Sequence, residues 1–291
     1  MSRPVAFSKY QGTGNDFVMV VDLDDERPFS PAEVAALCDR RTGVGADGVI
    51  RLVRGREAGA ELFMDYANAD GSVAEMCGNG IRCVGVLAHD RGLVEGSSFD
   101  VATRVGVRHL ELHPGDDGDD RTVGSVTVEM GRANFTKASI PMRGPAWETF
   151  LGQPLEVGPD LTLPASAVSM GNPHLVLFVE EDPARYHVAH IGSALEHHEL
   201  FPEGANVEFA RIEADRIDVR VWERGSGETM ACGSGACAVA VAAHEAGLAP
   251  ARVTIRFPGG DVEVERRDDG EVFLTGPAVH VFDGTIEPAR A

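Results

Sequence analysis

A short motif of cysteine and glycine occurs twice in the chain, each time directly before an apolar run. Cys77 begins the sequence CGNG, and Cys232 begins CGSG. The runs that follow are IRCVGVLAHDR and ACAVAVAAHEA. Runs that are apolar nearly all round are typical of a helix buried at the centre of its domain. The sequence therefore predicts two central helices, each entered through a cysteine and two glycines.

The spacing of these landmarks indicates an internal duplication. The two cysteines are 155 residues apart, and so are the Gly-Leu pairs at 92–93 and 247–248 that end the apolar runs. Gly-Asn pairs at 14–15 and 171–172 are 157 residues apart, and each precedes an apolar strand. Three matches in one order predict an α+β fold of two pseudo-symmetric lobes. Each lobe would wrap strands around a central helix, with the active site in the cleft between the lobes.

The division between the lobes is expected where the composition changes. Residues 135–163 are rich in proline, glycine and mixed polar residues, and the pattern of strands begins again after them. We therefore expect an N-terminal lobe over 1–133 and a C-terminal lobe over 134–291. The last strand, near 277–291, would return to the first lobe.

Local patterns predict two helix starts and one hairpin tip. Ser30-Pro-Ala-Glu33 is a capping box whose helix would end at Gly43, and Ser193-Ala-Leu-Glu196 is a second candidate. The segment HPGDDGDDR, residues 113–121, separates two stretches of alternating residues and predicts an acidic hairpin tip.

Charge and hydropathy limit the partners of the chain. Its 291 residues contain 26 basic and 46 acidic side chains, a formal net charge of −20, which disfavours binding to nucleic acid or an anionic membrane. No apolar run approaches the roughly 18 residues of a membrane helix, and the N-terminus lacks the apolar core of a signal peptide. We expect a cytoplasmic protein with neither nucleic acid nor membrane as partner.

Two thiols at two helix starts suit acid–base chemistry. The N–H groups at a helix start favour an anion, and a cysteine there is expected to ionise below the ordinary thiol pKa of about 8.5. Pseudo-twofold symmetry would aim both thiols at one point, on opposite faces of an α-carbon. One thiolate would remove a proton from one face while the other thiol delivers a proton to the second face. This arrangement predicts inversion of a carbon centre.

Other uses of the five cysteines stay open. Cys77 and Cys232 could form a redox pair. The spacing from Cys232 to Cys237 just reaches the upper limit for a zinc pair, although no suitable second pair accompanies it. Cys83 and Cys237, and Cys38 in the first helix, fit buried core positions. We expect no metal and no cofactor, because the histidines lack metal spacing and neither lysine marks a pyridoxal site.

The motifs of the chain resemble those of the diaminopimelate epimerase family. The matching stretches are GTGNDFVMVVD, NADGSVAEMCGNGIRC, MGNPHLV, GANVEF, WERGSGETMACGSGAC and FPGG. They follow the family order through nearly the whole chain. The resemblance implies interconversion of LL- and meso-diaminopimelate in lysine and peptidoglycan precursor biosynthesis, without pyridoxal. It also implies a homodimer, with Cys77 and Cys232 as the two acid–base residues.

The same resemblance implies the residues that hold the substrate, which are Asn15, Asn68, Gly78, Asn79, Asn172, Asn206, Glu223, Arg224, Gly233 and Ser234. Backbone N–H groups at the two helix starts would bind the reacting carboxylate. Arg224 would bind the distal carboxylate and Glu223 the distal ammonium, and His174 and Glu223 would adjust the protonation of the thiols. The alternatives are a related two-cysteine proline or hydroxyproline racemase and a thiol redox protein. The Glu-Arg pair argues against the racemase, whose substrate has no distal charges.

Overall fold

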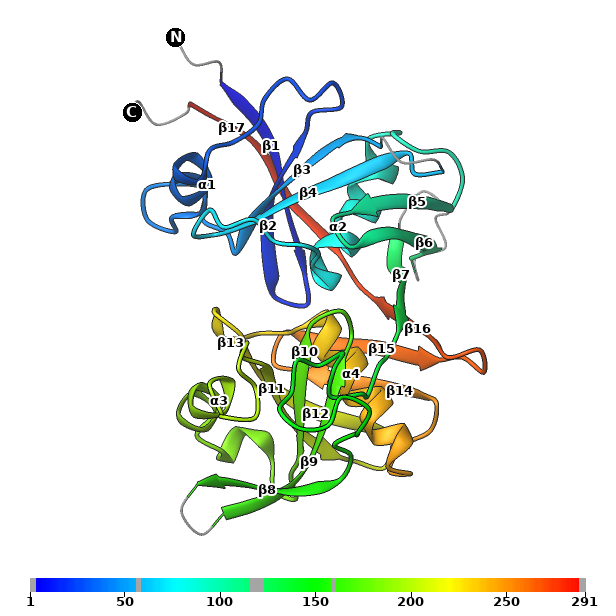
Figure 1. Ribbon diagram of the computed structural model, residues 1–291. Coiled ribbons are helices and arrows are strands. Elements are labelled where there is room, and N and C mark those ends of the chain that lie inside the picture. The colour runs from blue at the N-terminus through cyan, green and yellow to red at the C-terminus, as the bar shows by residue number, and fades with distance from the viewer. Residues whose placement is uncertain (1–3, 56–58, 116–122, 159–160, 288–291) are drawn as a thin grey trace. The chain divides into compact units, whose positions relative to one another are not determined.

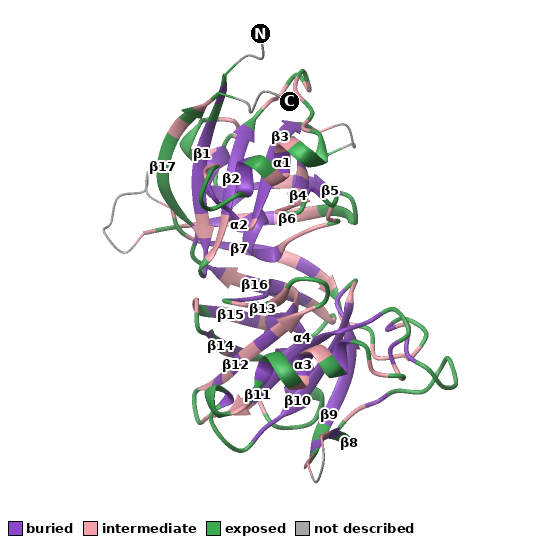
Figure 2. Cartoon of the chain, turned by 90° about the vertical axis from the view of Figure 1, so that its left-hand side faces the viewer, coloured by how far each residue is buried: buried purple, intermediate pink, exposed green. Residues whose placement is uncertain are grey.

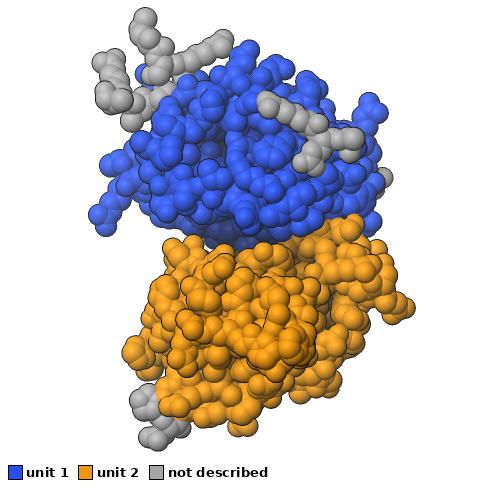
Figure 3. All heavy atoms as spheres, viewed as in Figure 1, with its two compact units in different colours: residues 1–128, 276–291 blue, residues 129–275 orange. Residues whose placement is uncertain are grey.

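Strands and helices follow one another in the same order twice along the chain (Figure 1). The computed structural model describes residues 4–55, 59–115, 123–158 and 161–287. Contacts divide the chain into two units, residues 1–128 with 276–291 and residues 129–275 (Figure 3).

The first unit is a mixed sheet with one buried helix. Its strands are β1 (Val5–Gly12), β2 (Asn15–Val21), β3 (Gly48–Arg54), β4 (Leu62–Asn68), β5 (Ser98–Thr103), β6 (Gly106–Pro114), β7 (Val123–Arg132) and β17 (Val279–Ile286). Neighbours are antiparallel, except that β2 pairs with β3 and β4 with β5 in parallel. Helix α2 (Gly78–Asp90) lies against β1, β2, β6 and β17 and is buried along most of its length (Figure 2). The short helix α1 (Pro31–Cys38) connects β2 to β3.

The second unit repeats this plan. Its strands are β8 (Gln153–Gly158), β9 (Leu161–Ser169), β10 (Pro173–Phe178), β11 (Asn206–Ile212), β12 (Arg216–Glu223), β13 (Gly227–Thr229), β14 (Arg252–Phe257), β15 (Gly260–Arg266) and β16 (Glu271–Gly276). Here β10 pairs with β11 and β12 with β14 in parallel. Helix α4 (Gly233–Glu245) lies against β9, β10, β11, β14 and β15. Helix α3 (Val188–Glu196) and the 3-10 turn η1 (Pro183–Arg185) connect β10 to β11.

The order of directions is the same in both units. The series antiparallel, parallel, antiparallel, parallel, antiparallel runs through β1 to β6 and again through β9, β10, β11, β12, β14 and β15. The helix α2 follows β4 as α4 follows the β12–β13 hairpin. The predicted α+β duplication, with strands around a central helix in each lobe, is confirmed.

Two local predictions need correction. The capping box at Ser30 is present, but α1 ends at Cys38, before Gly43, because the Asp39 carboxylate accepts the next backbone N–H groups. The second capping box is wrong, since Ser193 lies inside α3, whose N-cap is His187.

The predicted hairpin tip at 113–121 joins β6 to β7, which pair in antiparallel fashion. Residues 116–122 of that connection lie outside the described residues.

The segment with the changed composition packs into the second unit. Ile140, Met142 and Phe150 belong to its core, together with side chains of β9, β10 and β11. Among the helices that the structure describes, none is long and apolar enough to cross a membrane.

Candidate active site

The two motif cysteines occupy the same position at the start of their helices. Cys77 is the N-cap of α2, with φ −135° and ψ 120°. Cys232 is the N-cap of α4, with φ −130° and ψ 119°. Each sulfur accepts the backbone N–H of the third helical residue, Gly80 or Gly235, at 3.4 Å. The thiols thus take the capping position that a hydroxyl or carboxylate often holds. The predicted correspondence between Cys77 and Cys232 extends to their backbone angles.

The second glycine of each motif leaves room for a side chain from the sheet. A Cβ atom at Gly80 would lie 2.8 Å from Ile50 Cδ1, and one at Gly235 would lie 2.8 Å from Glu208 Oε1. Neither position tolerates a side chain without movement of its neighbour. The neighbour is apolar in the first unit and a carboxylate in the second.

Amide groups surround Cys77. Its sulfur lies 3.6 Å from Asn15 Oδ1, and Asn79 Nδ2 lies 3.5 Å from the same oxygen. Asn15 is fixed in this orientation because its Nδ2 donates to Asp47 at 2.6 Å. Arg40 in turn donates to the other oxygen of Asp47. Two predicted site residues, Asn15 and Asn79, are therefore brought to the thiol, with Asn15 offering its oxygen to it.

Asn68 lies at the end of β4, in a turn. Its Nδ2 donates to Ser72 Oγ at 3.0 Å, and its backbone pairs with Gly48 across β3. Ser72 also donates to Asp70, so the side chain of Asn68 is held by the turn. None of the hydrogen bonds described for Asn68 reaches Cys77.

Acidic groups surround Cys232. The negative charge of Glu223 acts on the thiol, and its sulfur lies 3.5 Å from Ser234 Oγ. Burial raises the pKa of Cys232 well above its ordinary value, and the charges of Glu223 and Glu208 raise it further. The expectation of easier ionisation at a helix start is wrong for this thiol, because burial and two carboxylates outweigh the helix N-terminus.

Glu223 is itself a perturbed acid. Burial raises its pKa, and the nearby charge of Glu208 adds to that effect. The hydrogen bond from Thr229 and the charge of His174 act in the opposite direction without cancelling it. The Glu223 carboxylate is thus coupled to the thiol beside it.

A hydrogen-bond network lies behind Cys232. His174 Nδ1 is 2.6 Å from Glu208 Oε1, and His174 Nε2 is 2.9 Å from Asn172 Oδ1. Asn172 Nδ2 donates to Ser234 Oγ at 3.4 Å. The predicted residues Asn172, His174 and Ser234 therefore form one connected group with the thiol.

Asn206 and Arg224 are linked through the backbone. Asn206 is buried, donates to Pro173 O at 3.0 Å and accepts the backbone N–H of Arg224 at 2.9 Å. The Arg224 guanidinium is exposed and donates to Glu203 O at 3.1 Å. Asn206 therefore supports the chain at Arg224, with both ends of its amide used by backbone groups.

Sequence reasoning missed three residues that hold the predicted ones in place. Asp47 orients Asn15, Thr229 donates to Glu223, and Glu208 binds His174. Glu208 carried a signal, since a glutamate within the apolar stretch NVEF of a predicted strand demands a partner. The other two carried none that distinguishes them from ordinary turn and strand residues.

The remaining three cysteines are buried in helices, as predicted. Burial raises the pKa of Cys38 to about 11 and that of Cys83 to about 12. Cys237 is fully buried in α4. All five cysteines lie within the described residues and are free thiols.

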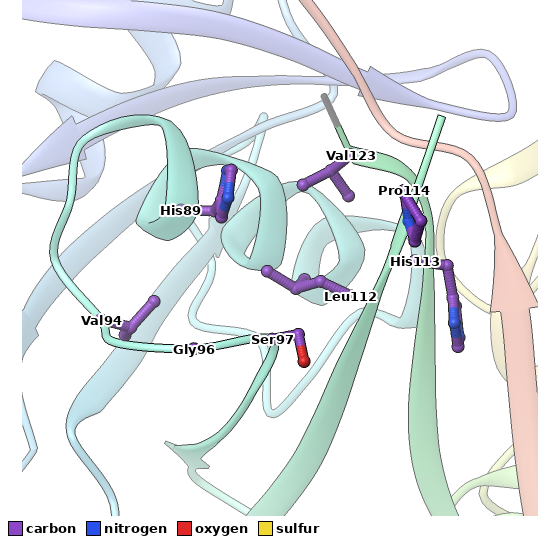
Figure 4. Close-up of a pocket in the computed structure, with 8 residues that line it drawn as sticks. All are labelled: His89, Val94, Gly96, Ser97, Leu112, His113, Pro114 and Val123. Atoms are coloured by element: carbon purple, nitrogen blue, oxygen red, sulfur yellow. The ribbon is translucent and has the colours of Figure 1, made fainter. Parts of the chain in front are cut away.

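A hollow of about 500 Å³ occurs elsewhere in the first unit (Figure 4). It is lined by His89, Val94, Gly96, Ser97, Leu112, His113, Pro114 and Val123. His89 is in the last turn of α2, at the opposite end of the helix from Cys77. The hollow is therefore lined by none of the predicted site residues.

Comparisons with known proteins agree with this geometry. The family whose sequence model matches the chain is described as diaminopimelate epimerase, over residues 7–136 and 166–281. The diaminopimelate epimerase of Desulforudis audaxviator is 46% identical over 282 residues, which are 96% of this chain and 98% of that protein. That of Leptospira biflexa is 41% identical over 285 residues, 97% of this chain and 99% of that protein.

Solved structures share the fold at low identity. A hydroxyproline epimerase from Agrobacterium vitis matches with a TM-score of 0.72 and 13% identity, over 98% of this chain and 94% of that one. A PhzF-family phenazine biosynthesis protein from Bacillus anthracis matches with a TM-score of 0.68 and 16% identity, over 98% and 99%.

The family match and these relatives define the class of protein as an epimerase, and the two similar halves, each with a cysteine capping its central helix, agree with it. The chain belongs to the diaminopimelate epimerase family, since both the family match and the full-length relatives extend over most of it.

Proposed function

We propose that the protein interconverts LL- and meso-2,6-diaminopimelate by proton transfer through Cys77 and Cys232. The observation that carries the proposal is the matched pair of cysteine N-caps, with backbone angles within a few degrees of each other, in a chain of this family. The proposal requires that each expected lobe, 1–133 and 134–291, contributes one thiol to the same substrate carbon.

The reaction is a balanced exchange of one proton for another. The cysteine present as thiolate takes the α-proton from one face, which leaves the electron pair of the C–H bond on the α-carbon. The cysteine present as thiol then delivers its proton to the opposite face. The centre is inverted, and the two cysteines have exchanged protonation states. The raised pKa of Cys232 supports its being the thiol at rest.

The carbanion needs stabilisation, because an amino acid α-proton is a very weak acid. Backbone N–H groups in the first turns of α2 and α4, at Gly78, Asn79, Gly233 and Ser234, would bind the reacting carboxylate. Donors fixed before the reaction stabilise developing charge without reorganising.

The far end of the substrate would be recognised by charge. The exposed guanidinium of Arg224 suits the distal carboxylate. Asn15, Asn68, Asn172 and Asn206 complete the proposed substrate-binding set, Asn206 by holding the backbone at Arg224. The effect of the Glu223 charge on the pKa of Cys232 supports the thiol-adjusting role of Glu223 more than its role at the distal ammonium.

Solvent exchange tests the proposal. When LL-diaminopimelate is incubated with the enzyme in heavy water, the meso product should contain deuterium at the inverted carbon and none at the other α-carbon. The same incubation with L-proline should give no exchange. Absence of deuterium from the inverted carbon, or exchange into proline, would contradict the proposal.

We also propose a cytoplasmic homodimer. Five free thiols suit a reducing compartment. The apolar side chains of Val279, Val281 and Phe282 are about half exposed on β17, a face suited to self-association. Sedimentation equilibrium should give twice the mass of 30.9 kDa, and a monomer at micromolar concentration would remove this part of the proposal.

A further inference from the structure

The two units differ at one buried position behind the helix start. In the parallel pair β2–β3, Phe17 is opposite Gly48, and Ile50 lies two residues further along. In the parallel pair β10–β11, His174 is opposite Asn206, and Glu208 lies two residues further along. The apolar pair Phe17 and Ile50 therefore corresponds to the polar pair His174 and Glu208.

The fold does not require the polar pair His174 and Glu208 at these buried positions. All four side chains are fully buried, at 0% exposure. Taking ionisable groups out of water is costly, and replacing a buried ion pair by apolar residues is often neutral or stabilising. The first unit builds the same element with Phe17 and Ile50, so a reason for His174 and Glu208 has to come from the chemistry of the second unit.

The hydrogen bonds assign a direction to the network. Asn172 donates through Nδ2 to Ser234. Its Oδ1, which faces His174, has no hydrogen and therefore acts as the acceptor in the hydrogen bond with His174. His174 Nε2 must therefore carry a hydrogen. Glu208, 2.6 Å from Nδ1, satisfies the other ring nitrogen whether the proton between them resides on the imidazole or on the carboxyl. Without a partner at Nδ1, the ring would be free to place its hydrogen there and turn an acceptor towards Asn172.

We propose that Glu208 is a positioning residue that, through His174, holds the N–H end of the Asn172 amide towards Ser234 and Cys232. The inference rests on the proposed function, because Asn172 and Cys232 act there on the substrate. The glycine at position 235 supports it, since any Cβ there would lie 2.8 Å from Glu208 Oε1 and 3.4 Å from Cys232 Sγ. Within the described residues Glu208 Oε2 accepts no hydrogen bond, so His174 is what holds this carboxylate.

Replacement by the pair of the first unit is the main test. The double variant His174→Phe/Glu208→Ile should fold, with a melting temperature no lower than that of the wild type. Its kcat should fall by about 10- to 100-fold, the loss expected when a reacting group is misplaced by about 1 Å. Glu208→Ile alone should lose as much kcat, since the two residues act as one unit. A double variant with wild-type kcat would overturn the proposal.

The conservative variant separates hydrogen bonding from charge. In Glu208→Gln the amide can donate to Nδ1, which leaves the hydrogen of His174 on Nε2. This variant should recover most of the kcat that Glu208→Ile loses, with little change in KM. Equal loss in both variants would contradict positioning by a hydrogen bond. Leu177→Val, a core change in β10, is the control for general destabilisation and should keep wild-type kcat.

A spectroscopic readout does not depend on activity. In ¹⁵N-labelled enzyme at pH 8, the Nε2–H of buried His174 should give a slowly exchanging ring signal that is missing in His174→Phe and lost or broadened in Glu208→Ile. A wild-type spectrum without that signal would overturn the inference even if the enzyme is active. A wild type that shows the signal but does not invert diaminopimelate would instead refute the proposed function.

Discussion

The two helix starts have the same backbone geometry but different neighbouring side chains. Cys77 and Cys232 have nearly equal cap angles, and each sulfur accepts a glycine N–H at the same distance. The amides of Asn15 and Asn79 lie beside Cys77, whereas the charges of Glu223 and Glu208 act on Cys232. The duplication gives the two cysteines matched geometry, and the neighbouring side chains described at each cysteine differ. The proposed two-base inversion would benefit from both, since it requires one thiol as the base and the other as the acid.

The two cysteines also differ in how far they are buried. Cys232 is 6% exposed, while Cys77 is half-buried. A buried thiol beside carboxylates is stabilised in its protonated form. The difference between the thiols is therefore built into the units before any substrate binds.

The largest expected effect comes from removing either thiol. Cys77→Ala and Cys232→Ala should each lower kcat for inversion by about 10²- to 10⁴-fold, the usual contribution of a general acid or base. Circular dichroism and thermal unfolding should show an intact fold. If either variant keeps full activity, the claim that both cysteines act as acid–base groups is contradicted.

A smaller difference is expected between the glycines that face the sheet. Gly235→Ala would press on the Glu208 carboxylate and crowd Cys232, so kcat should fall by about tenfold or more. Gly80→Ala would meet the ends of the Ile50 and Met64 side chains, which can move, so its loss should be clearly smaller. Steady-state kinetics of the two variants measure the difference. Equal losses of kcat in the two variants would indicate that the pair His174 and Glu208 does not make Gly235 less tolerant of a side chain than Gly80.

The smallest activity effect concerns the amide beside Cys77. Asp47→Ala removes the acceptor that orients Asn15, and a lost hydrogen bond of about 1 kcal/mol should lower kcat/KM by about fivefold. Asp47→Asn retains an oxygen acceptor and should recover most of that loss. If the alanine variant has wild-type kcat/KM, Asn15 does not depend on Asp47 for its orientation.

The duplicated elements could be predicted from the sequence because their signals are local. Cysteine and glycines before an apolar run mark a helix start, and repeated spacing relates the two halves. The Ser30 capping box was correct for the same reason, whereas Ser193 failed because it lies within a helix that begins at Val188. Short polar motifs identify a helix start only where the preceding residues leave the helix.

The residues that support the site are harder to predict from the sequence. Glu208 contacts His174 across two parallel strands, and Asp47 contacts Asn15 from 32 residues away. Such contacts depend on strand register, which a single sequence specifies weakly. The ionisation of Cys232 was mispredicted because the helix start was visible in the sequence while burial and the neighbouring carboxylates were not.

The most direct test of unequal surroundings is the ionisation of Cys232. In Cys77→Ala, the pH dependence of iodoacetamide alkylation at Cys232, mapped by mass spectrometry, should have a midpoint above the ordinary thiol pKa of about 8.5. Burial and the carboxylates disfavour the thiolate, so alkylation should be slow at neutral pH and rise only as pH passes the raised pKa. Glu223→Gln removes one negative charge and should move the midpoint down, whereas Glu228→Gln, at the exposed middle position of β13, should not. A midpoint at or below the ordinary value, or one unmoved by Glu223→Gln, would contradict the account.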